Sequence, residues 1–481
     1  MKKILLLILA ITMLLGTLAG CNDGGKGNGV ETTAAPVETD APYELTVVDM
    51  ENEEMVILAP YGKIWQFEEW SYNSDNLNLA ILRRNDRVED TLNCDIKMSW
   101  VHGSGSSVAS AMDELLTQEM LGQTGAYDMV FAEYWWNLEA KGYFENLIDS
   151  ELSPVIALDQ PFFCQGWNDV ATINNTLVSA MGYGSVEMMA RVTVTYFNKP
   201  WYESLFDGNV YDFITNGQWT LETMEAMSKI AESDLNEDGM DVEQGDKFGF
   251  LCPLQSGRAL FYSMGGRFWQ KNADGAWTYD YLSDANVQRF DALYDFINDN
   301  EYLANEDYTV QAKWFADNQV LFFLSELSLG TTIKKTGDVK YGLLPFPKFN
   351  TDQTDYISTL SNAASYSIPT TADSKVNSGI FLNAYNYFAY DTIRPAYYEQ
   401  VLKLENVQDP ESAGVIDLVM NSIYLDFGFI YNANLGTINN IYYDTLIRQG
   451  KRQFQSEYYK KLETLDQDLA DFIAAYTRMN G

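Results

Sequence analysis

The stretch YDMVFAEYWWNLEAKGYFENL, residues 127–147, indicates the fold most directly. It begins with YDMVFAEY, a short apolar run that is typical of a buried strand in a parallel sheet. Turn residues should follow such a strand, yet Glu133, Tyr134, Trp135 and Trp136 come at its end. Because ligands of open α/β sheets bind outside the carboxyl ends of the strands, we expect these four residues to line a ligand site.

The surrounding segments alternate between strand-like and helix-like patterns. Residues 53–61 (EEMVILAPY) and 95–101 (DIKMSWV) have strand patterns, whereas 78–94 and 107–121 have apolar residues at helical spacing. This alternation predicts an α/β fold, in which mostly parallel sheets are covered by helices. From about residue 375 the pattern is helical to the end of the chain.

A further helix is predicted directly after Thr220, whose hydroxyl group suits an N-cap. The apolar residues at helical spacing in this segment form the predicted buried stripe: Leu221, Met224, Met227, Ile230 and Ala231.

Composition excludes several classes of partner and site. The 481 residues are enough for two large domains, and the formal net charge is −37. Such an acidic surface repels phosphate backbones, so we expect no nucleic-acid partner. The single histidine, His102, excludes metal sites that need several histidines. Aromatic residues make up 14% of the chain, with 31 Tyr and 11 Trp, which indicates surfaces that grip a ligand.

The N-terminus has the pattern of an export signal. Residues 1–20 combine a short basic segment with an apolar core, and LAGC ends at Cys21, as in a lipobox. We expect Cys21 to be lipidated, although an ordinary signal peptide with an incidental cysteine is the alternative. Residues 21–43 are rich in Gly, Thr, Pro and acids and form a flexible linker. The protein is therefore expected on the extracytoplasmic face of the cell membrane, held by its lipid anchor.

The remaining cysteines are Cys94, Cys164 and Cys252, with no C-x-x-C pair. They allow one disulfide at most, and the favoured alternative is that all three are buried and reduced.

Seven segments, taken in order, resemble bacterial extracellular solute-binding proteins of family 1, the maltodextrin-binding-like receptors of ABC importers. The resemblance extends over residues 45 to about 481, behind the lipobox. Its segments are YDMVFAEYWWNLEAKGYFENL, VTYFNKPWYESLF, GQWTLETMEAMSKIA, DLNEDGMDVEQGDKFGF, FADNQVLFFLSEL, YGLLPFPKFN and SIPTTA.

The resemblance implies a two-lobe fold of the type II periplasmic-binding-protein kind. One lobe would comprise 44–152 plus 305–362, and the other 153–304 plus 363–481. The implied function is capture of a sugar or oligosaccharide between the lobes by hinge closure, without catalysis. The implied partners are the carbohydrate ligand and the ABC permease subunits, and we expect a monomer.

Ligand contacts are predicted where aromatic rings could stack on a sugar and polar groups could bind its hydroxyls. For each aromatic residue, burial in the core is the alternative. The predicted ligand-binding residues are Trp65, Glu133, Tyr134, Trp135, Trp136, Tyr183, Trp269, Glu326, Asn362, Tyr366 and Tyr431.

The segment DLNEDGMD resembles the first half of an EF-hand loop. Asp234, Asn236, Asp238 and the Met240 carbonyl stand at ligand spacing, which suggests structural Ca²⁺. The glutamate expected at the twelfth position is replaced by Gly245, so an acidic turn without metal is the alternative.

Two other functions stay open from the sequence. An exported glycoside hydrolase would also use carboxylates and aromatic residues. A receptor of the same fold could instead bind a peptide, a polyamine or another small solute.

Overall fold

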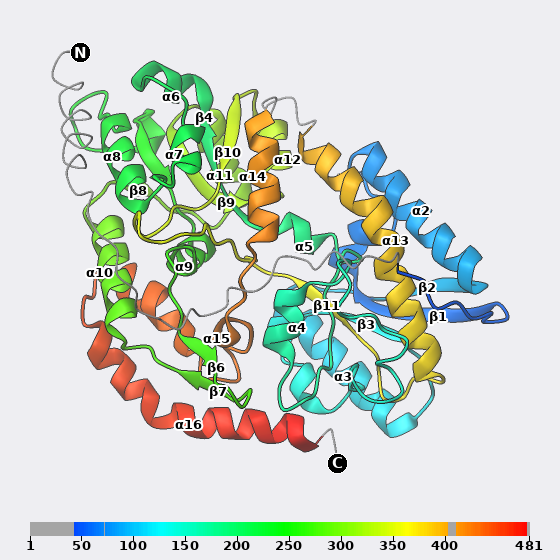
Figure 1. Ribbon diagram of the computed structural model, residues 1–481. Coiled ribbons are helices and arrows are strands. Elements are labelled where there is room, and N and C mark those ends of the chain that lie inside the picture. The colour runs from blue at the N-terminus through cyan, green and yellow to red at the C-terminus, as the bar shows by residue number, and fades with distance from the viewer. Residues whose placement is uncertain (1–42, 72, 403–409, 479–481) are drawn as a thin grey trace, which may run out of the picture. The chain divides into compact units, whose positions relative to one another are not determined.

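Two helix-covered β-sheets form the centre of the described chain, which comprises residues 43–71, 73–402 and 410–478 of this computed structural model (Figure 1). The predicted signal peptide, Cys21 and the linker up to residue 42 lie outside the described residues, so lipidation and export stay predictions.

The first sheet has the strand order β11-β3-β1-β2. Strands β1 (Glu53–Pro60), β2 (Cys94–Val101) and β3 (Met129–Glu133) are parallel, and β11 (Ala364–Ser367) runs antiparallel to β3. Every residue of β3 is buried, which confirms the prediction made from the apolar run at 127–134.

The second sheet has the order β10-β4-β9-β5-β8. Strand β4 runs antiparallel to both of its neighbours, whereas β5 is parallel to β9 and to β8. A separate hairpin pairs β6 with β7. The bounds of these strands are Thr193–Asn198 (β4), Phe248–Leu251 (β5), Trp269–Lys271 (β6), Trp277–Tyr279 (β7), Tyr302–Leu303 (β8), Val320–Glu326 (β9) and Tyr341–Leu344 (β10).

The strand pairing corrects one part of the expected lobe division. Residues 305–362 were assigned to the first lobe, but β9 and β10 lie within this range and pair in the second sheet. Conversely, β11 at 364–367 was assigned to the second lobe and pairs with β3. Apolar periodicity identifies a buried strand but not its neighbours, and neighbours decide lobe membership.

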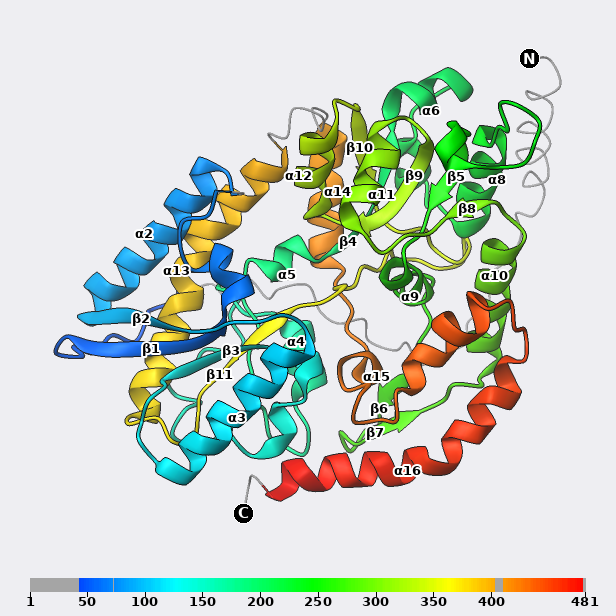
Figure 2. The same ribbon diagram turned by 180° about the vertical axis from the view of Figure 1, so that it is seen from behind.

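Helices cover both sheets, and the chain is helical after residue 375, as expected (Figures 1 and 2). Helix α13 packs against α2, and α14 packs against β10. The helices are α2 (Asp75–Leu92), α3 (Ser106–Gly122), α4 (Gln165–Ala171), α5 (Glu187–Ala190), α6 (Lys199–Leu205), α7 (Tyr211–Thr215), α8 (Leu221–Ala231), α9 (Leu254–Ser263), α10 (Asp284–Asn298), α11 (Tyr308–Ala316), α12 (Leu329–Thr336), α13 (Lys375–Leu402), α14 (Pro410–Asn421), α15 (Phe427–Ile430) and α16 (Phe454–Arg478).

Helix α8 begins where the sequence predicts. The Thr220 hydroxyl oxygen accepts a hydrogen bond from the Thr223 backbone N–H at 3.3 Å, which satisfies one of the free donors of the first turn. The predicted stripe is buried except for Ile230, which is 47% exposed; Ser228 is buried in this helix instead.

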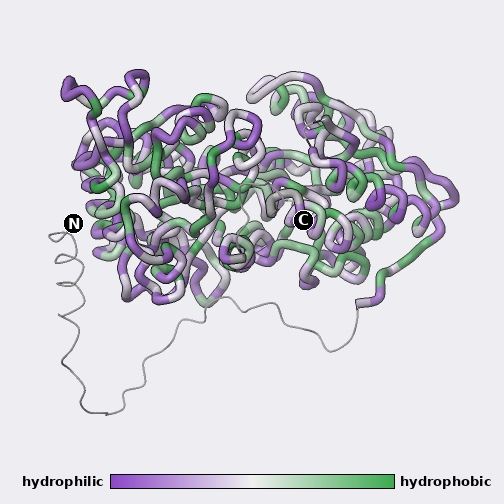
Figure 3. Tube along the Cα trace, turned by 90° about the horizontal axis from the view of Figure 1, so that it is seen from above, coloured by the Kyte–Doolittle hydropathy of each residue, from purple (hydrophilic) through white to green (hydrophobic). Residues whose placement is uncertain are grey.

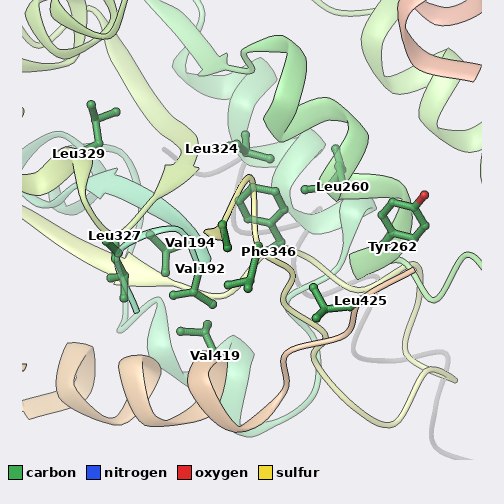
Figure 4. Packing of buried hydrophobic residues seen from close by; sticks show 14 of the residues in the cluster. Val192, Val194, Leu260, Tyr262, Leu324, Leu327, Leu329, Phe346, Val419 and Leu425 are labelled. Carbon is green, nitrogen blue, oxygen red and sulfur yellow. The ribbon is translucent and has the colours of Figure 1, made fainter. Parts of the chain in front are cut away.

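The core of the second sheet is built by residues from distant parts of the sequence. Figure 4 shows Val194 of β4, Leu324 of β9, Leu260 of α9 and Val419 of α14 around Phe346. Along the trace, apolar residues gather in the interior and hydrophilic ones in the outer turns (Figure 3).

Within the described residues, no helix is both long and apolar enough to span a bilayer. Cys94, Cys164 and Cys252 are all free; Cys94 and Cys252 are buried and Cys164 is half-buried. The favoured alternative from the sequence, three buried and reduced cysteines, therefore agrees with the structure except that Cys164 is half-buried.

Candidate functional site

Acidic residues end two strands that belong to different sheets. Glu133 is the last residue of β3 in the first sheet, and Glu326 is the last residue of β9 in the second. Lys63 lies on the short 3-10 helix Tyr61–Gln66 that directly follows β1. Glu187 begins α5, which lies on the connection between the sheets (Figure 1).

These side chains form a continuous series of ion pairs. Lys63 Nζ lies 2.5 Å from Glu133 Oε1 and 2.6 Å from Glu187 Oε1. Arg191 NH2 lies 3.5 Å from Glu187 Oε1, and its NH1 pairs with Glu326. The charges alternate in sign, so a chain of ion pairs joins the end of β3 to the end of β9.

A second connection between the sheets contacts both ends of this series. Ser361 and Asn362 lie between β10 and β11. The Ser361 hydroxyl donates to Glu326, and Asn362 Nδ2 donates to Glu133 Oε2 at 3.2 Å. The Ser361 N–H also donates to the Arg191 carbonyl at 3.0 Å. We refer to Lys63, Glu133, Glu187, Arg191, Glu326, Ser361 and Asn362 as the junction cluster.

The junction cluster is largely removed from water. Exposed fractions are 0% for Glu187, 3% for Glu326, and 8% for both Lys63 and Glu133. Burial by itself would lower the pKa of Lys63, but Glu187 and Glu133 outweigh it and raise this pKa. Burial would likewise raise the pKa of Glu187, but Lys63 and Arg191 lower it. Both groups are therefore held in their charged forms.

Four buried polar atoms in and beside the cluster have no hydrogen-bond partner: Gln66 Nε2, Glu187 Oε2, Arg191 Nε and Asn362 Oδ1. Two of these atoms are donors and two are acceptors. Each unpaired buried polar atom costs about 1–3 kcal/mol, so the cluster favours a guest that offers both donors and acceptors.

The charges around the cluster balance once Arg84 is included. Arg84 is fully buried and forms no ion pair among the residues described, and it donates to the Gln66 carbonyl at 3.1 Å. Gln66 in turn accepts from the Glu187 N–H at 3.1 Å. Lys63, Arg84 and Arg191 thus equal the three glutamates in number, and Lys63 and Arg191 are the two that pair with them. An uncharged guest would leave this balance undisturbed.

Tyr134 explains part of the aromatic run at the end of β3. Its ring is 5% exposed and lies 5.9 Å from the ring of Trp167 on α4 and 6.2 Å from that of Phe429 on α15. Trp136 is also buried, and the side chain of Trp135 lies outside the described residues. The aromatic surface next to Glu133 is thus largely packed against other elements.

Of the predicted ligand contacts, the structure brings together Glu133, Glu326 and Asn362 in the junction cluster. Trp65 is half-buried on the same 3-10 helix as Lys63.

The remaining candidates lie elsewhere, and their role as ligand contacts stays a prediction. Tyr183 is half-buried with its ring 5.0 Å from that of Tyr390. Trp269 is buried and donates to the Tyr281 hydroxyl at 2.6 Å. The rings of Tyr366 and Tyr431 are buried as well. The Tyr366 ring packs against Phe131, and the Tyr431 ring packs against Phe472.

Sequence reasoning missed Lys63, Glu187, Arg191 and Ser361. A usable signal existed for two of them, because Lys63 follows the first strand closely and Arg191 precedes β4. Strand β4 is wholly buried and the last four residues of β1 are buried, and a charged residue beside such a buried stretch suggests a partner across the fold.

The acidic loop at 234–240 is arranged as a turn. Asp234 Oδ1 accepts from the Glu237 N–H at 2.7 Å, and Oδ2 accepts from the Gly239 N–H at 2.8 Å. No group of three or more acidic, histidine or cysteine side chains in the described residues is placed to hold a metal. Calcium binding at Asp234, Asn236, Asp238 and Met240 stays a prediction.

Two cavities lie away from the junction cluster. One, of about 540 Å³, is lined by Tyr43, Glu44, Thr46 and parts of 148–159. The other, of about 350 Å³, lies between α2 and β2. Within the cluster, Lys63, Glu133, Glu187 and Glu326 are buried, whereas Arg191, Ser361 and Asn362 are half-buried.

Several solved structures share this arrangement of sheets and helices. An ABC transporter solute-binding protein from Thermotoga lettingae, bound with α-D-tagatose, aligns with a TM-score of 0.54 at 11% identity over 87% of this chain and 100% of that chain. The fold is that of a type II periplasmic binding protein.

Two further type II proteins align similarly. A cyclo/maltodextrin-binding protein complexed with maltotetraose has a TM-score of 0.54 at 14% identity, covering 89% of this chain and 98% of that chain. Maltose-bound MalE3 of T. maritima has a TM-score of 0.51 at 11% identity, covering 89% and 99%. No known family profile and no curated protein matches the sequence, so the likeness establishes the type II fold alone.

Proposed function

We propose that this protein is the solute-binding receptor of an ABC importer and captures an uncharged, polyhydroxylated solute between its two lobes. The observation that carries the proposal is the junction cluster, in which carboxylates from the carboxyl ends of strands in both sheets meet. Open α/β sheets bind their ligands at the carboxyl ends of strands. Its unpaired donors and acceptors suit hydroxyl groups, each of which can donate and accept.

The solved structures of this fold support a sugar or polyol. Their bound molecules are α-D-tagatose, maltose, maltotetraose and ribitol. The junction cluster and Arg84 together hold equal numbers of positive and negative charges. This equality favours an uncharged solute over a polyamine or a charged peptide, because a net charge brought into a buried site is costly.

Hinge closure is the proposed mechanism. The segments 345–363 and 134–192 both pass between the sheets, and both contribute residues to the junction cluster. A solute bound to Glu133 and Glu326 would contact both lobes and so favour the closed state. In the proposed setting, Cys21 carries the lipid anchor and permease subunits receive the closed receptor.

The main alternative, a glycoside hydrolase, fits the cluster less well. A general acid needs a carboxyl with a raised pKa. The pKa of Glu187 is instead lowered, and Glu133 and Glu326 are each ion-paired with a cation.

A melting-temperature screen tests the proposal. The mature protein is heated with maltose, maltotetraose, D-tagatose, ribitol, spermidine and a short peptide. A neutral glycan or polyol at 100 times its Kd should add about 2.7 kcal/mol of stability. Stabilisation by spermidine or the peptide alone would contradict the proposed solute class, and release of cleaved sugar would show an enzyme.

A control variant should link the ligand to the junction cluster. Glu326→Gln removes one charge of the cluster, whereas Glu203→Gln changes an exposed residue of α6. Glu326→Gln should raise the Kd of the solute at least about tenfold, and Glu203→Gln should leave this Kd unchanged.

A further inference from the structure

Lys63 holds two buried carboxylates together. Its Nζ lies 2.5 Å from Glu133 and 2.6 Å from Glu187, both shorter than the 3.5 Å between Arg191 and Glu187. The side chains of Lys63, Glu133 and Glu187 are 11%, 10% and 1% exposed. Little water can therefore replace the ammonium group at this position.

The two described arginines in and beside the cluster have their main contacts elsewhere. Arg191 is directed mainly to Glu326, with which it pairs through NH1. Arg84 reaches the cluster only through the Gln66 carbonyl and forms no ion pair in the described chain. Without Lys63, Glu133 and Glu187 would form a buried anionic site, and such a site binds a cation strongly because uncompensated buried charge is costly.

We propose that Lys63 is the residue that sets the charge specificity of the junction cluster. Its ammonium group occupies the position that the ammonium of a cationic solute would otherwise take, and this leaves the site open to uncharged solutes. This inference rests on the proposed function. It identifies Lys63 as the side chain that excludes amine-bearing solutes.

Chemical rescue tests the proposal without knowledge of the natural ligand. Lys63→Ala removes three methylene groups and the ammonium, which together correspond to propylammonium. We expect propylammonium chloride to raise the melting temperature of this variant in a saturable way, with an apparent Kd at least about tenfold lower than for the unaltered protein. Sodium chloride at equal ionic strength and 1-propanol should give no such saturable effect.

A second pair of probes measures charge specificity, which would not change if Lys63 had a purely structural role. D-glucosamine and D-glucose differ in size only slightly but in charge by one unit. Lys63→Ala should be stabilised more by glucosamine than by glucose, and the unaltered protein should show no preference for glucosamine.

Two variants serve as controls. Lys97→Ala removes an exposed lysine that pairs with Asp95 on the surface, and propylammonium should leave it unaffected. Lys63→Ala combined with Glu187→Gln restores the charge balance, so this double variant should lose the response to propylammonium.

The outcomes separate the two proposals. If Lys63→Ala prefers the cation in neither probe pair, the role of Lys63 is overturned. If Lys63→Ala does not fold by itself, its folded yield is measured with propylammonium present. Recovery of folded protein then supports the role of Lys63, and the absence of recovery overturns it. If rescue succeeds but no glycan or polyol stabilises the unaltered protein, the role of Lys63 stands and the receptor proposal fails.

Discussion

Glu139 is a carboxyl group with little contact to water and no ion pair in the described chain. It lies on a short 3-10 helix that packs against α16, is 4% exposed, and its Oε2 has no hydrogen-bond partner. Burial raises its pKa to about 8, well above the ordinary value of 4.5. Tyr431 and Tyr476 are close enough for the charge of Glu139 to affect their pKa values. The stability of the contact between this 3-10 helix and α16 therefore depends on whether Glu139 is protonated.

Replacing Glu139 by Gln should remove a pH-dependent loss of stability. The folded state keeps the proton up to a pH of about 8, whereas the unfolded chain releases it near 4.5. Stability therefore falls as pH rises through this window and the loss is complete above it. We expect Glu139→Gln to match the unaltered protein at pH 4 and to exceed it by about 2–4 kcal/mol at pH 9.

Urea unfolding at several pH values measures this difference. Glu203→Gln on the exposed face of α6 is the matched control and should show no comparable trend. A constant offset between Glu139→Gln and the unaltered protein across the pH range would contradict the assignment.

At the scale of elements, local sequence signals set where helices begin, and packing sets which of their residues are buried. Thr220 caps α8 as predicted, because N-capping depends on a hydroxyl group and its own following turn. Ile230, in contrast, is 47% exposed although it fits the apolar stripe. Its burial depends on the curvature and neighbours of the helix, which spacing alone does not give.

The cap of α8 can be tested directly. Thr220→Ala should lower the free energy of unfolding by about 1 kcal/mol, since the Thr223 N–H loses its acceptor. Thr220→Ser keeps the oxygen and should recover most of this stability. An Ala variant as stable as the Ser variant in urea unfolding would show that the cap contributes nothing.

At the scale of the whole molecule, charge is the dominant feature. A net charge of −37 on 481 residues produces self-repulsion that opposes the compact state. The junction cluster is a local exception, since its cations and carboxylates alternate and, together with Arg84, are equal in number. The self-repulsion of the acidic surface therefore does not extend to the junction cluster, where opposite charges are paired.

Added salt should stabilise the protein by screening this repulsion. We expect the melting temperature to rise between about 10 mM and about 150 mM sodium chloride, where the Debye length falls to about 8 Å. Calcium and magnesium chloride at equal ionic strength should give equal shifts if screening alone acts. A larger, saturable shift with calcium, abolished by Asp234→Asn, would instead support the predicted calcium loop.

The sequence alone determined the α/β class, the buried strand β3 and the start of α8, because these depend on the spacing of neighbouring residues and on caps within one turn. It also placed Glu133 and Glu326 at strand ends, where a ligand site was expected. Only the tertiary structure decided that β9 and β10 belong to the second sheet, and that Lys63 and Arg191 join the two glutamates. Such pairings link residues far apart in the chain, and local periodicity carries no information about which distant strand or charge will lie opposite.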